Sequence, residues 1–244
     1  MNTTKINWCD VSWNPFSGCT KIAQGCKNCY AEKLHTMRHK AFLEGKKLPQ
    51  QYAKPFSEIQ FFPKRLSDPK LKNKKPLRIF VNSMSDIFHN NITDGQINQV
   101  FEVIEKHQQH TFMILTKRIN RAVEWSFQDT PNLWLGFSAS TQKEYNENID
   151  WLLESNAKIK WVSIEPQLEK INILKWGHVQ WVVCGCESGT NRRPFDNSWA
   201  LGIAEYSKDG LPVWIKQIRD KENKVIEDID LFPNELRIRE LPNV

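Results

Sequence analysis

The amino-acid sequence predicts an α/β protein in which repeated strand–helix units build a full or partial (β/α) barrel behind an N-terminal cysteine loop. Three features of the sequence support this prediction. From residue 77 onward, short apolar runs alternate with longer segments of helical period. The runs are nearly continuous in apolar residues, as in parallel strands that are covered on both faces. Each run ends in polar residues, which in such folds converge at the carboxyl ends of the strands.

The predicted strands are runs rich in β-branched and aromatic residues. They are LRIFVNS (77–83), TFMILTK (111–117), LWLGFSA (133–139), KWVSIEP (160–166), VQWVVCG (179–185) and LPVWIKQ (211–217). Their tryptophans, including Trp134, Trp161, Trp181 and Trp214, are expected in the core. A barrel, or a large part of one, is favoured over an open sheet.

Predicted helices connect these strands. Residues 94–110 follow the first strand, and Thr93 or Asp94 would cap this helix. Its apolar face follows the i, i+3, i+4, i+7 pattern through Ile97, Val100, Phe101 and Ile104. Further helices are predicted at 145–156 and at 197–210, where Gly210 ends the pattern.

The length of 244 residues and the hydrophobic content of 40% predict one domain, 1–244. Residues 1–40 would hold the cysteine loop and the first helix, 41–75 a basic excursion, and 76–244 the strand–helix units. No run of about 18 apolar residues occurs, so we expect a cytoplasmic protein without membrane association. The net charge of +6 favours a polyanionic partner such as a nucleic acid, although solvated surface charge explains it equally well.

Three of the six cysteines form a C-x6-C-x2-C motif, Cys19, Cys26 and Cys29, in a glycine-containing loop before a helix. Clustered cysteines in a reducing compartment more often bind metal than form disulfides. Three thiolates suit a [4Fe–4S] cluster with one open iron, whereas structural zinc normally takes four ligands. The spacing alone leaves both open, and Cys9 as a fourth ligand would favour zinc. Cys184 and Cys186 end an apolar strand, where a buried thiol is expected.

Polar side chains at the ends of successive strands predict a ligand site. They are Asn82, Ser83, Ser85, Asp86, Thr116, Lys117, Arg118, Ser138, Ser140, Glu165, Glu187, Ser188, Lys216 and Gln217. Parallel strands bring such residues to one edge of the sheet. The alternative for each residue is a helix cap or a strand-end hydrogen bond.

Several separated strings resemble, in the same order, those of the phage and prophage three-Cys-motif protein family, which is related to the radical SAM superfamily. They are TKINWCDVSWNPFSGCTKIAQGCKNCYAEK, RIFVNSMSDIFH, HTFMILTKR, LWLGFSAS, VSIEPQL, CESGTNRRPF and WIKQ. The resemblance implies a radical SAM-like barrel, a [4Fe–4S] cluster on the three motif cysteines, S-adenosyl-L-methionine as cofactor, and a separate three-Cys-motif partner protein. The first cysteine gap is longer than the C-x3-C-x2-C spacing of common radical SAM enzymes.

The resemblance also implies roles for the strand-end residues. Asn82, Ser83 and Asp86 would contact the methionine end of the cofactor, and Ser138 and Glu165 its ribose or sulfonium. The residues assigned to catalysis are Lys117, Glu187 and Lys216, and those assigned to substrate binding are Arg118, Arg192 and Arg193. Arginines can hold a phosphate by bidentate hydrogen bonds. The structural alternative is an ion pair between Lys117 and Glu187 that closes the mouth of the barrel.

We therefore expect a radical SAM enzyme that generates a 5′-deoxyadenosyl radical to modify or repair a nucleic acid. Basic residues between 64 and 78 would line a path to its site. One alternative is a radical SAM enzyme that acts on a peptide or metabolite. The other is a zinc-bearing protein that binds nucleic acid or a partner without catalysis.

Overall fold

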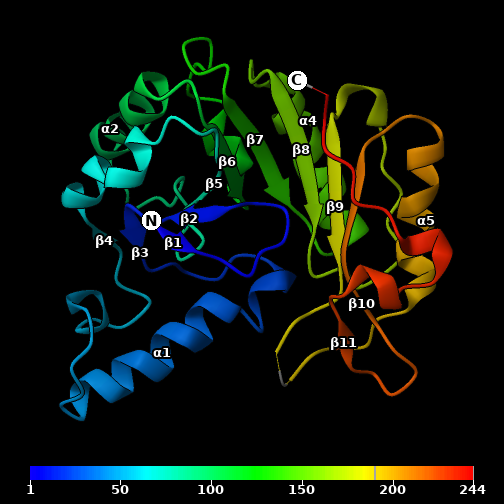
Figure 1. Ribbon diagram of the computed structural model, residues 1–244, viewed down its shortest axis with the longest axis horizontal. Coiled ribbons are helices and arrows are strands. Elements are labelled where there is room, and N and C mark those ends of the chain that lie inside the picture. The colour runs from blue at the N-terminus through cyan, green and yellow to red at the C-terminus, as the bar shows by residue number, and fades with distance from the viewer. Residues whose placement is uncertain (190, 244) are drawn as a thin grey trace.

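The computed structural model describes residues 1–189 and 191–243 and contains a nine-stranded sheet with helices (Figure 1). The strands are β1 (Asn2–Thr3), β2 (Val11–Trp13), β3 (Phe16–Ser17), β4 (Gln60–Phe61), β5 (Arg78–Val81), β6 (Thr111–Thr116), β7 (Leu133–Ser138), β8 (Ile159–Ile164), β9 (Trp181–Gly185), β10 (Val213–Arg219) and β11 (Val225–Ile226). The helices are α1 (Tyr30–Leu43), α2 (Asp94–Lys106), α3 (Ile119–Ala122), α4 (Gln142–Glu154) and α5 (Asn197–Lys208).

The strand order of the main sheet is β1-β2-β5-β6-β7-β8-β9-β10-β11. All neighbours from β2 to β10 are parallel, and β1 and β11 add antiparallel edges. Because right-handed crossovers between sequential neighbours place their helices on one face, α2, α4 and α5 share the same core. The predicted α/β architecture with a parallel sheet is confirmed.

The sheet is not a closed barrel in the described residues, because β2 and β10 form no pair with each other. The segment before β2 meets β10 through side chains instead. Asn7 donates from Nδ2 to the Lys216 carbonyl at 3.3 Å and accepts the Trp214 Nε1–H at 3.0 Å. Of the expected full or partial barrel, the full, closed form is therefore not found in the described residues.

The second face of the sheet carries a layer of aromatic side chains. Trp8, from the segment before β2, packs against Trp161 and Trp181, with ring centroids 5.5 and 6.1 Å away. Trp134 and Trp214 belong to the same cluster. The prediction that the strand tryptophans lie in the core is confirmed. This tryptophan layer fills the inner side of the sheet as layered side chains do in barrels.

Most predicted elements are found, and their boundaries have local causes. All the predicted apolar runs contain strands. Thr93 caps α2, because its Oγ1 accepts the Gln96 N–H at 3.4 Å. α4 begins at Gln142, earlier than predicted, because the Thr141 hydroxyl caps it. The short strand β2 has no counterpart among the predicted strands.

The excursion between α1 and β5 contains three short 3₁₀ helices, Gln50–Tyr52, Pro63–Ser67 and Pro69–Lys72, separated by irregular segments and β4. Its last part packs beside the amino ends of β5 and β6, where His110 Nε2 lies 3.0 Å from the Leu71 carbonyl and Gln109 Nε2 donates to the Asn73 carbonyl at 3.3 Å. The basic stretch 70–75 thus lies at the end of the sheet opposite the predicted site. The expectation that basic residues between 64 and 78 line a path to that site is therefore wrong for the stretch 70–75.

Candidate functional site

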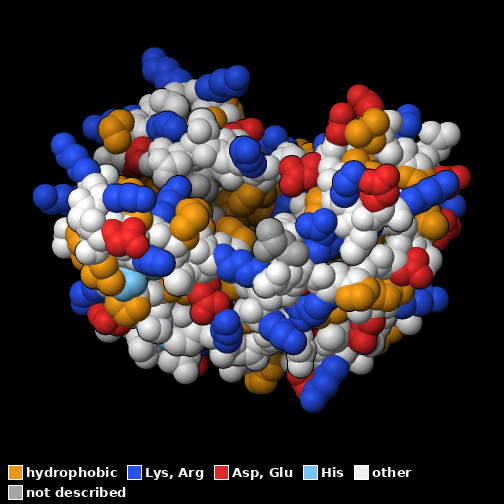
Figure 2. Space-filling view, turned by 90° about the horizontal axis from the view of Figure 1, so that it is seen from below, with side chains coloured by type: hydrophobic (Ala, Val, Ile, Leu, Met, Phe, Trp, Pro, Cys, Tyr) orange, Lys and Arg blue, Asp and Glu red, His pale blue; other side chains and the backbone are white. Residues whose placement is uncertain are grey.

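The carboxyl ends of the parallel strands form one edge of the sheet, which we call the mouth. Figure 2 looks onto this edge and shows a hollow with apolar side chains inside it and Lys and Arg side chains around it. At the strand ends, Lys216 Nζ lies 2.8 Å from Glu165 Oε1, and Ser163 Oγ donates to Glu165 Oε2 at 3.3 Å. The side chains of Glu165 and Lys216 are 14% and 24% exposed. Glu165 and Lys216 thus lie together at the mouth, as predicted for the strand-end residues.

Lys117 lies on the same wall. Its Nζ donates to Ser138 Oγ at 2.6 Å, and Ser138 Oγ donates to the Glu165 carbonyl at 3.1 Å. The ion pair considered between Lys117 and Glu187 is not formed, because Glu187 pairs with Arg193 at 2.5 Å. Within the described part of the chain, no carboxylate lies within ion-pair distance of Lys117.

Residues 18–29, the cysteine loop, start beside the end of β5. The Gly18 N–H donates to the Met84 carbonyl at 3.0 Å, and Ser85 Oγ donates to the Gly18 carbonyl at 2.7 Å. The Cys19 N–H donates to the Phe56 carbonyl at 2.8 Å. Gly18 has φ +102°, a conformation that favours glycine. The start of the loop is therefore fixed by backbone contacts on both sides.

Asp86 and Arg118 form a buried ion pair next to this start, and each side chain is 9% exposed. Asp86 accepts hydrogen bonds from Arg118 Nη1 at 3.0 Å, Thr116 Oγ1 at 2.7 Å and the backbone N–H groups of Lys117 and Phe88, both at 3.1 Å. Both carboxylate oxygens are thus occupied by donors of the chain itself.

Arg118 in turn holds the cysteine loop. Its Nη2 donates to the carbonyl and the hydroxyl of Thr20, both at 3.1 Å, and its Nη1 lies 3.8 Å from Cys19 Sγ. His89 Nε2 lies 2.8 Å from Thr20 Oγ1. Because His89 Nδ1 accepts the Asn91 N–H at 3.1 Å, the neutral ring carries its proton on Nε2 and donates to Thr20. Burial, followed by the charge of Arg118, lowers the pKa of His89.

The middle of the cysteine loop rests on α4 and on the ends of β7 and β8. Glu144 accepts the Gln24 N–H at 2.6 Å and the Ser140 N–H at 2.7 Å. At Gly25 the loop approaches the strand ends so closely that a Cβ atom would lie 2.4 Å from Ser140 Oγ and 3.2 Å from Pro166 Cδ. A side chain at Gly25 would therefore push the loop away from the mouth.

The end of the cysteine loop contacts the residues that follow β9. Asn28 Nδ2 donates to Glu187 Oε2 at 3.0 Å, and Arg193 Nη1 donates to the Gln24 carbonyl at 3.0 Å. Burial by itself would raise the pKa of Glu187, but hydrogen bonds from Arg193 and Asn28 outweigh it, and the pKa lies below its ordinary value. Charged residues from the ends of β6 and β9 thus hold the loop at both ends.

The six cysteines fall into two groups. Cys19, Cys26 and Cys29 are half-buried in the cysteine loop, whereas the others are buried. Burial, followed by the charge of Asp86, raises the pKa of Cys19 to about 11 against the opposing effect of Arg118. Burial also raises the pKa of Cys9 to about 12. The expectation that Cys184 and Cys186 are buried is confirmed.

The metal-ligand role of the three motif cysteines stays a prediction. Across residues 1–189 and 191–243, no three side chains of His, Cys, Asp or Glu are grouped as they would be around a metal ion. The loop brings the three thiols to the same edge of the sheet without drawing their sulfur atoms into such a group. All six cysteines are free thiols.

The other predicted residues lie near the mouth but bond mainly to the chain itself. Asn82 Oδ1 accepts the Phe16 N–H at 3.2 Å, and Ser83 Oγ donates to Asn14 Oδ1 at 3.2 Å. Arg192 Nε donates to the Asn223 carbonyl at 3.2 Å. The guanidinium groups predicted to bind substrate phosphate thus make contacts within the protein.

Sequence reasoning missed residues that hold the loop. Thr20 and Asn28 lie inside the cysteine motif, and this position is the only sequence signal that points to them. Glu144 reaches the loop from α4, and His89 reaches it from the segment after β5. The hydroxyl of Tyr30, at the start of α1, donates a hydrogen bond to the Ser83 carbonyl at 2.7 Å. No spacing in the sequence links these residues.

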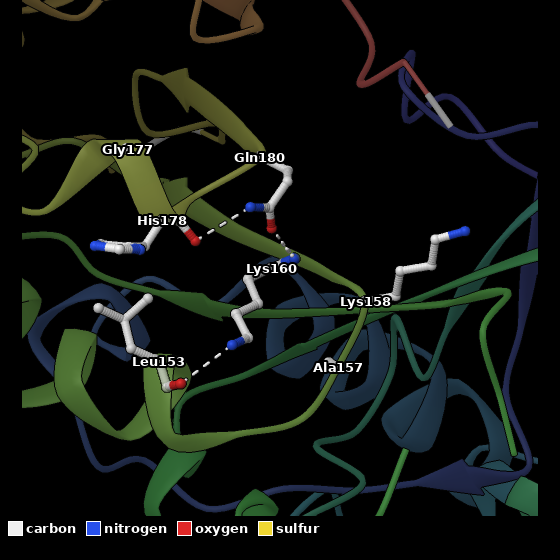
Figure 3. A pocket seen from close by; sticks show the side chains of 7 residues that line it. All are labelled: Leu153, Ala157, Lys158, Lys160, Gly177, His178 and Gln180. Atoms are coloured by element: carbon white, nitrogen blue, oxygen red, sulfur yellow. Dashed lines mark hydrogen bonds between the residues drawn. The ribbon is translucent and has the colours of Figure 1, made fainter. Parts of the chain in front are cut away.

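A separate cavity of about 360 Å³ lies at the opposite edge of the sheet, before β8 and β9 (Figure 3). Lys160 lines it, but its Nζ donates to the Leu153 carbonyl at the end of α4, at 3.1 Å. Gln180 Oε1 accepts the Lys160 N–H at 2.8 Å. Lys160 and Gln180 are therefore used within the fold.

None of the helices in residues 1–189 and 191–243 combines the length and the apolar character needed to cross a membrane. No curated protein and no solved structure matches the chain. Residues 3–229 match the family described as protein of unknown function (DUF5131), and the chain belongs to this family.

Proposed function

We propose that this chain is an iron–sulfur enzyme of the radical SAM type, in which Cys19, Cys26 and Cys29 hold a [4Fe–4S] cluster. One observation carries the proposal. The half-buried cysteines are the three of the motif, and they share one loop that strand-end side chains hold across the mouth. The mouth of a parallel sheet is where ligand sites of α/β proteins are built.

The donor atoms are of the right chemical type for such a cluster, although the described residues do not hold them as a preformed group. Thiolates are the usual ligands of iron–sulfur clusters. Cys29 stands at the N-cap of α1, and the helix dipole there favours a negative charge. The Arg118 guanidinium, 3.8 Å from Cys19 Sγ, opposes the burial and the Asp86 charge that raise the pKa of this thiol. Cys9 is an unsuitable fourth ligand for zinc, because its buried thiol belongs to the tryptophan layer and donates to the Ile6 carbonyl at 3.7 Å.

A reduced cluster bound by these cysteines would supply the one electron that breaks the sulfur–carbon bond of S-adenosyl-L-methionine, which yields methionine and a 5′-deoxyadenosyl radical. The chain itself offers a carboxylate, ammonium groups and a hydroxyl at the mouth, through Glu165, Lys216, Lys117 and Ser138. These groups complement the amino and carboxylate groups of the cofactor. In this proposal Glu165 and Ser138 orient the cofactor, whereas Lys117 and Lys216 face the reacting groups.

The fold and the substrate belong to the same proposal. The sequential order of parallel strands is the order of a (β/α) barrel, and we propose a radical SAM-like partial barrel. The net charge of +6 supports a nucleic-acid substrate, and the alternative is a peptide or metabolite. The three-Cys-motif partner protein rests on the sequence resemblance alone.

Anaerobic purification and reconstitution test the cluster. We expect about four irons per chain and a broad visible absorption that dithionite bleaches. Cys19→Ala, Cys26→Ala and Cys29→Ala should each abolish both signals. Cys184→Ala is the matched control, because it removes a thiol from the core and should keep both. Stoichiometric zinc without iron would contradict the proposal.

The cofactor reaction is tested separately. Reduced, reconstituted protein incubated with S-adenosyl-L-methionine should release 5′-deoxyadenosine. With deuterated DNA or RNA present, deuterium should appear in that product if a nucleic acid is the substrate. Unlabelled 5′-deoxyadenosine with both nucleic acids would instead favour a peptide or metabolite.

A further inference from the structure

Two segments far apart in the sequence meet where the cysteine loop ends. Besides its bond to Glu187, Asn28 Nδ2 donates to the Asn191 carbonyl at 2.7 Å. Arg193 reaches the Gln24 carbonyl at 3.0 Å. These contacts lie on both sides of Cys26 and next to Cys29, so they hold the part of the loop that carries two of the three motif cysteines.

Glu187 is the centre of this arrangement, and its side chain is 5% exposed. Besides Asn28, the carboxylate accepts hydrogen bonds from the Arg193 N–H at 2.7 Å, Nε at 3.1 Å and Nη2 at 2.5 Å. Its backbone carbonyl accepts Arg219 Nη2 at 2.7 Å, which fixes Glu187 to β10. The carboxylate is therefore saturated by donors of the chain and is poorly placed to exchange a proton with a ligand.

We propose that Glu187 and Arg193 are positioning residues that form a latch with Asn28 and fix the Cys26–Cys29 segment against the end of β9. A buried carboxylate that loses one partner keeps its desolvation cost, so the loss of any one contact weakens the latch as a whole. Glu144 gives the loop an attachment that is not part of the latch, because it accepts the Gln24 N–H at 2.6 Å. Breaking the latch frees Cys26 and Cys29 without unfolding the sheet.

The latch can be tested in metal-free protein, because Lys27 lies between Cys26 and Asn28 and offers trypsin a cleavage site inside the latched segment. Cleavage there requires local opening, and its rate follows the population of the open form. Glu187→Gln should raise cleavage after Lys27 by about tenfold or more, as expected for losing charge-assisted hydrogen bonds. Cleavage sites in the rest of the chain should keep their rates.

Two further variants make the test specific. Asn28→Ala removes the hydrogen bonds from Asn28 to Glu187 and to the Asn191 carbonyl, whereas the pair of Glu187 with Arg193 and the contact of Arg193 to the Gln24 carbonyl remain. This variant should also speed cleavage after Lys27, and it keeps the test decisive if Glu187→Gln folds poorly. Glu205→Gln is the matched control, because Glu205 forms an exposed ion pair with Lys208 on α5 at 2.7 Å. Folded Glu187→Gln and Asn28→Ala proteins with unchanged cleavage after Lys27 would overturn the latch.

The importance of the latch for cluster binding rests on the proposed function, and a second measurement separates the two. In reconstituted protein, both latch variants should lose iron to a chelator faster than wild type and Glu205→Gln. If wild type binds no iron while the variants open at Lys27, the proposed function fails and the latch stands. If wild type binds iron and the variants neither open nor lose it faster, the latch fails and the proposed function stands.

Discussion

Replacing Gly18 by alanine should detach the start of the cysteine loop from the strand edge. An added Cβ at this position would lie 2.3 Å from the Glu58 carbonyl oxygen and 2.9 Å from that of Phe56. Both are backbone atoms, so no rotation of a side chain can relieve the contact. The φ of +102° disfavours alanine in addition.

The two effects can be separated by magnitude. The positive φ alone costs alanine about 1–2 kcal/mol, and the forced contact adds about 1–3 kcal/mol. Gly18→Ala should therefore lower the free energy of unfolding by about 2–5 kcal/mol. Gly45→Ala is the matched control, because Gly45 has φ +83° and nothing within 4 Å of an added Cβ. Gly45→Ala should therefore lower the free energy of unfolding only by the cost of the positive φ, about 1–2 kcal/mol.

Urea unfolding followed by tryptophan fluorescence measures both values. Alkylation of Cys19, followed by mass spectrometry, reports whether the start of the loop has moved. We expect faster alkylation of Cys19 in Gly18→Ala and an unchanged rate in Gly45→Ala. Equal loss of stability in the two variants, within about 0.5 kcal/mol, would refute the argument that the Glu58 and Phe56 carbonyls crowd this position.

Three further predictions follow from the charged groups. Asp86→Asn leaves buried Arg118 without its counter-charge and should lower the free energy of unfolding, measured in urea, by about 3–5 kcal/mol. A decrease below about 1 kcal/mol would show that the pair is dispensable. Because the pKa of Glu187 is lowered, its stabilisation is complete above about pH 4.3 and fades as pH falls through the folded-state pKa. The stability difference between wild type and Glu187→Gln should thus shrink at pH 3, and a constant difference would contradict this. If nucleic acid binds at the mouth, its affinity should fall as the salt concentration rises. Because Lys72 lies at the opposite edge of the sheet, Lys72→Glu should leave the slope of log affinity against log salt concentration unchanged in filter-binding assays. A flatter slope in Lys72→Glu would place the binding surface there instead.

The parallel sheet could be predicted because burial on both faces leaves a direct mark in the sequence. Runs such as 111–117 and 179–185 are nearly continuous in apolar residues, and 94–110 carries a clear helical period. Strand β2 could not be predicted in this way, since its three residues are too few to show a pattern. Closure of the barrel also leaves no periodic signal, and whether β2 and β10 pair depends on the segment before β2.

The candidate site was predictable in position but not in its contacts. Polar residues at the ends of parallel strands must converge, and Glu165 and Lys216 do so. Which charges pair depends on distances between segments that are far apart in the sequence. The sequence therefore could not show that Glu187 pairs with Arg193 rather than with Lys117, or that Asp86 pairs with Arg118.

The contacts at the mouth distinguish Lys117 from the charged groups that hold the cysteine loop. Asp86, Arg118, Glu187 and Arg193 form buried or half-buried pairs whose remaining hydrogen bonds go to the cysteine loop and to its neighbours on the strand ends. Substitutions there should change how firmly the loop is held before they change what the protein recognises. Lys117 differs, because in the described residues its ammonium group has a hydroxyl but no carboxylate as partner. A half-buried ammonium group keeps unused donors for a ligand, so recognition of a cofactor or substrate at the mouth should depend more on Lys117 than on the arginines that hold the loop.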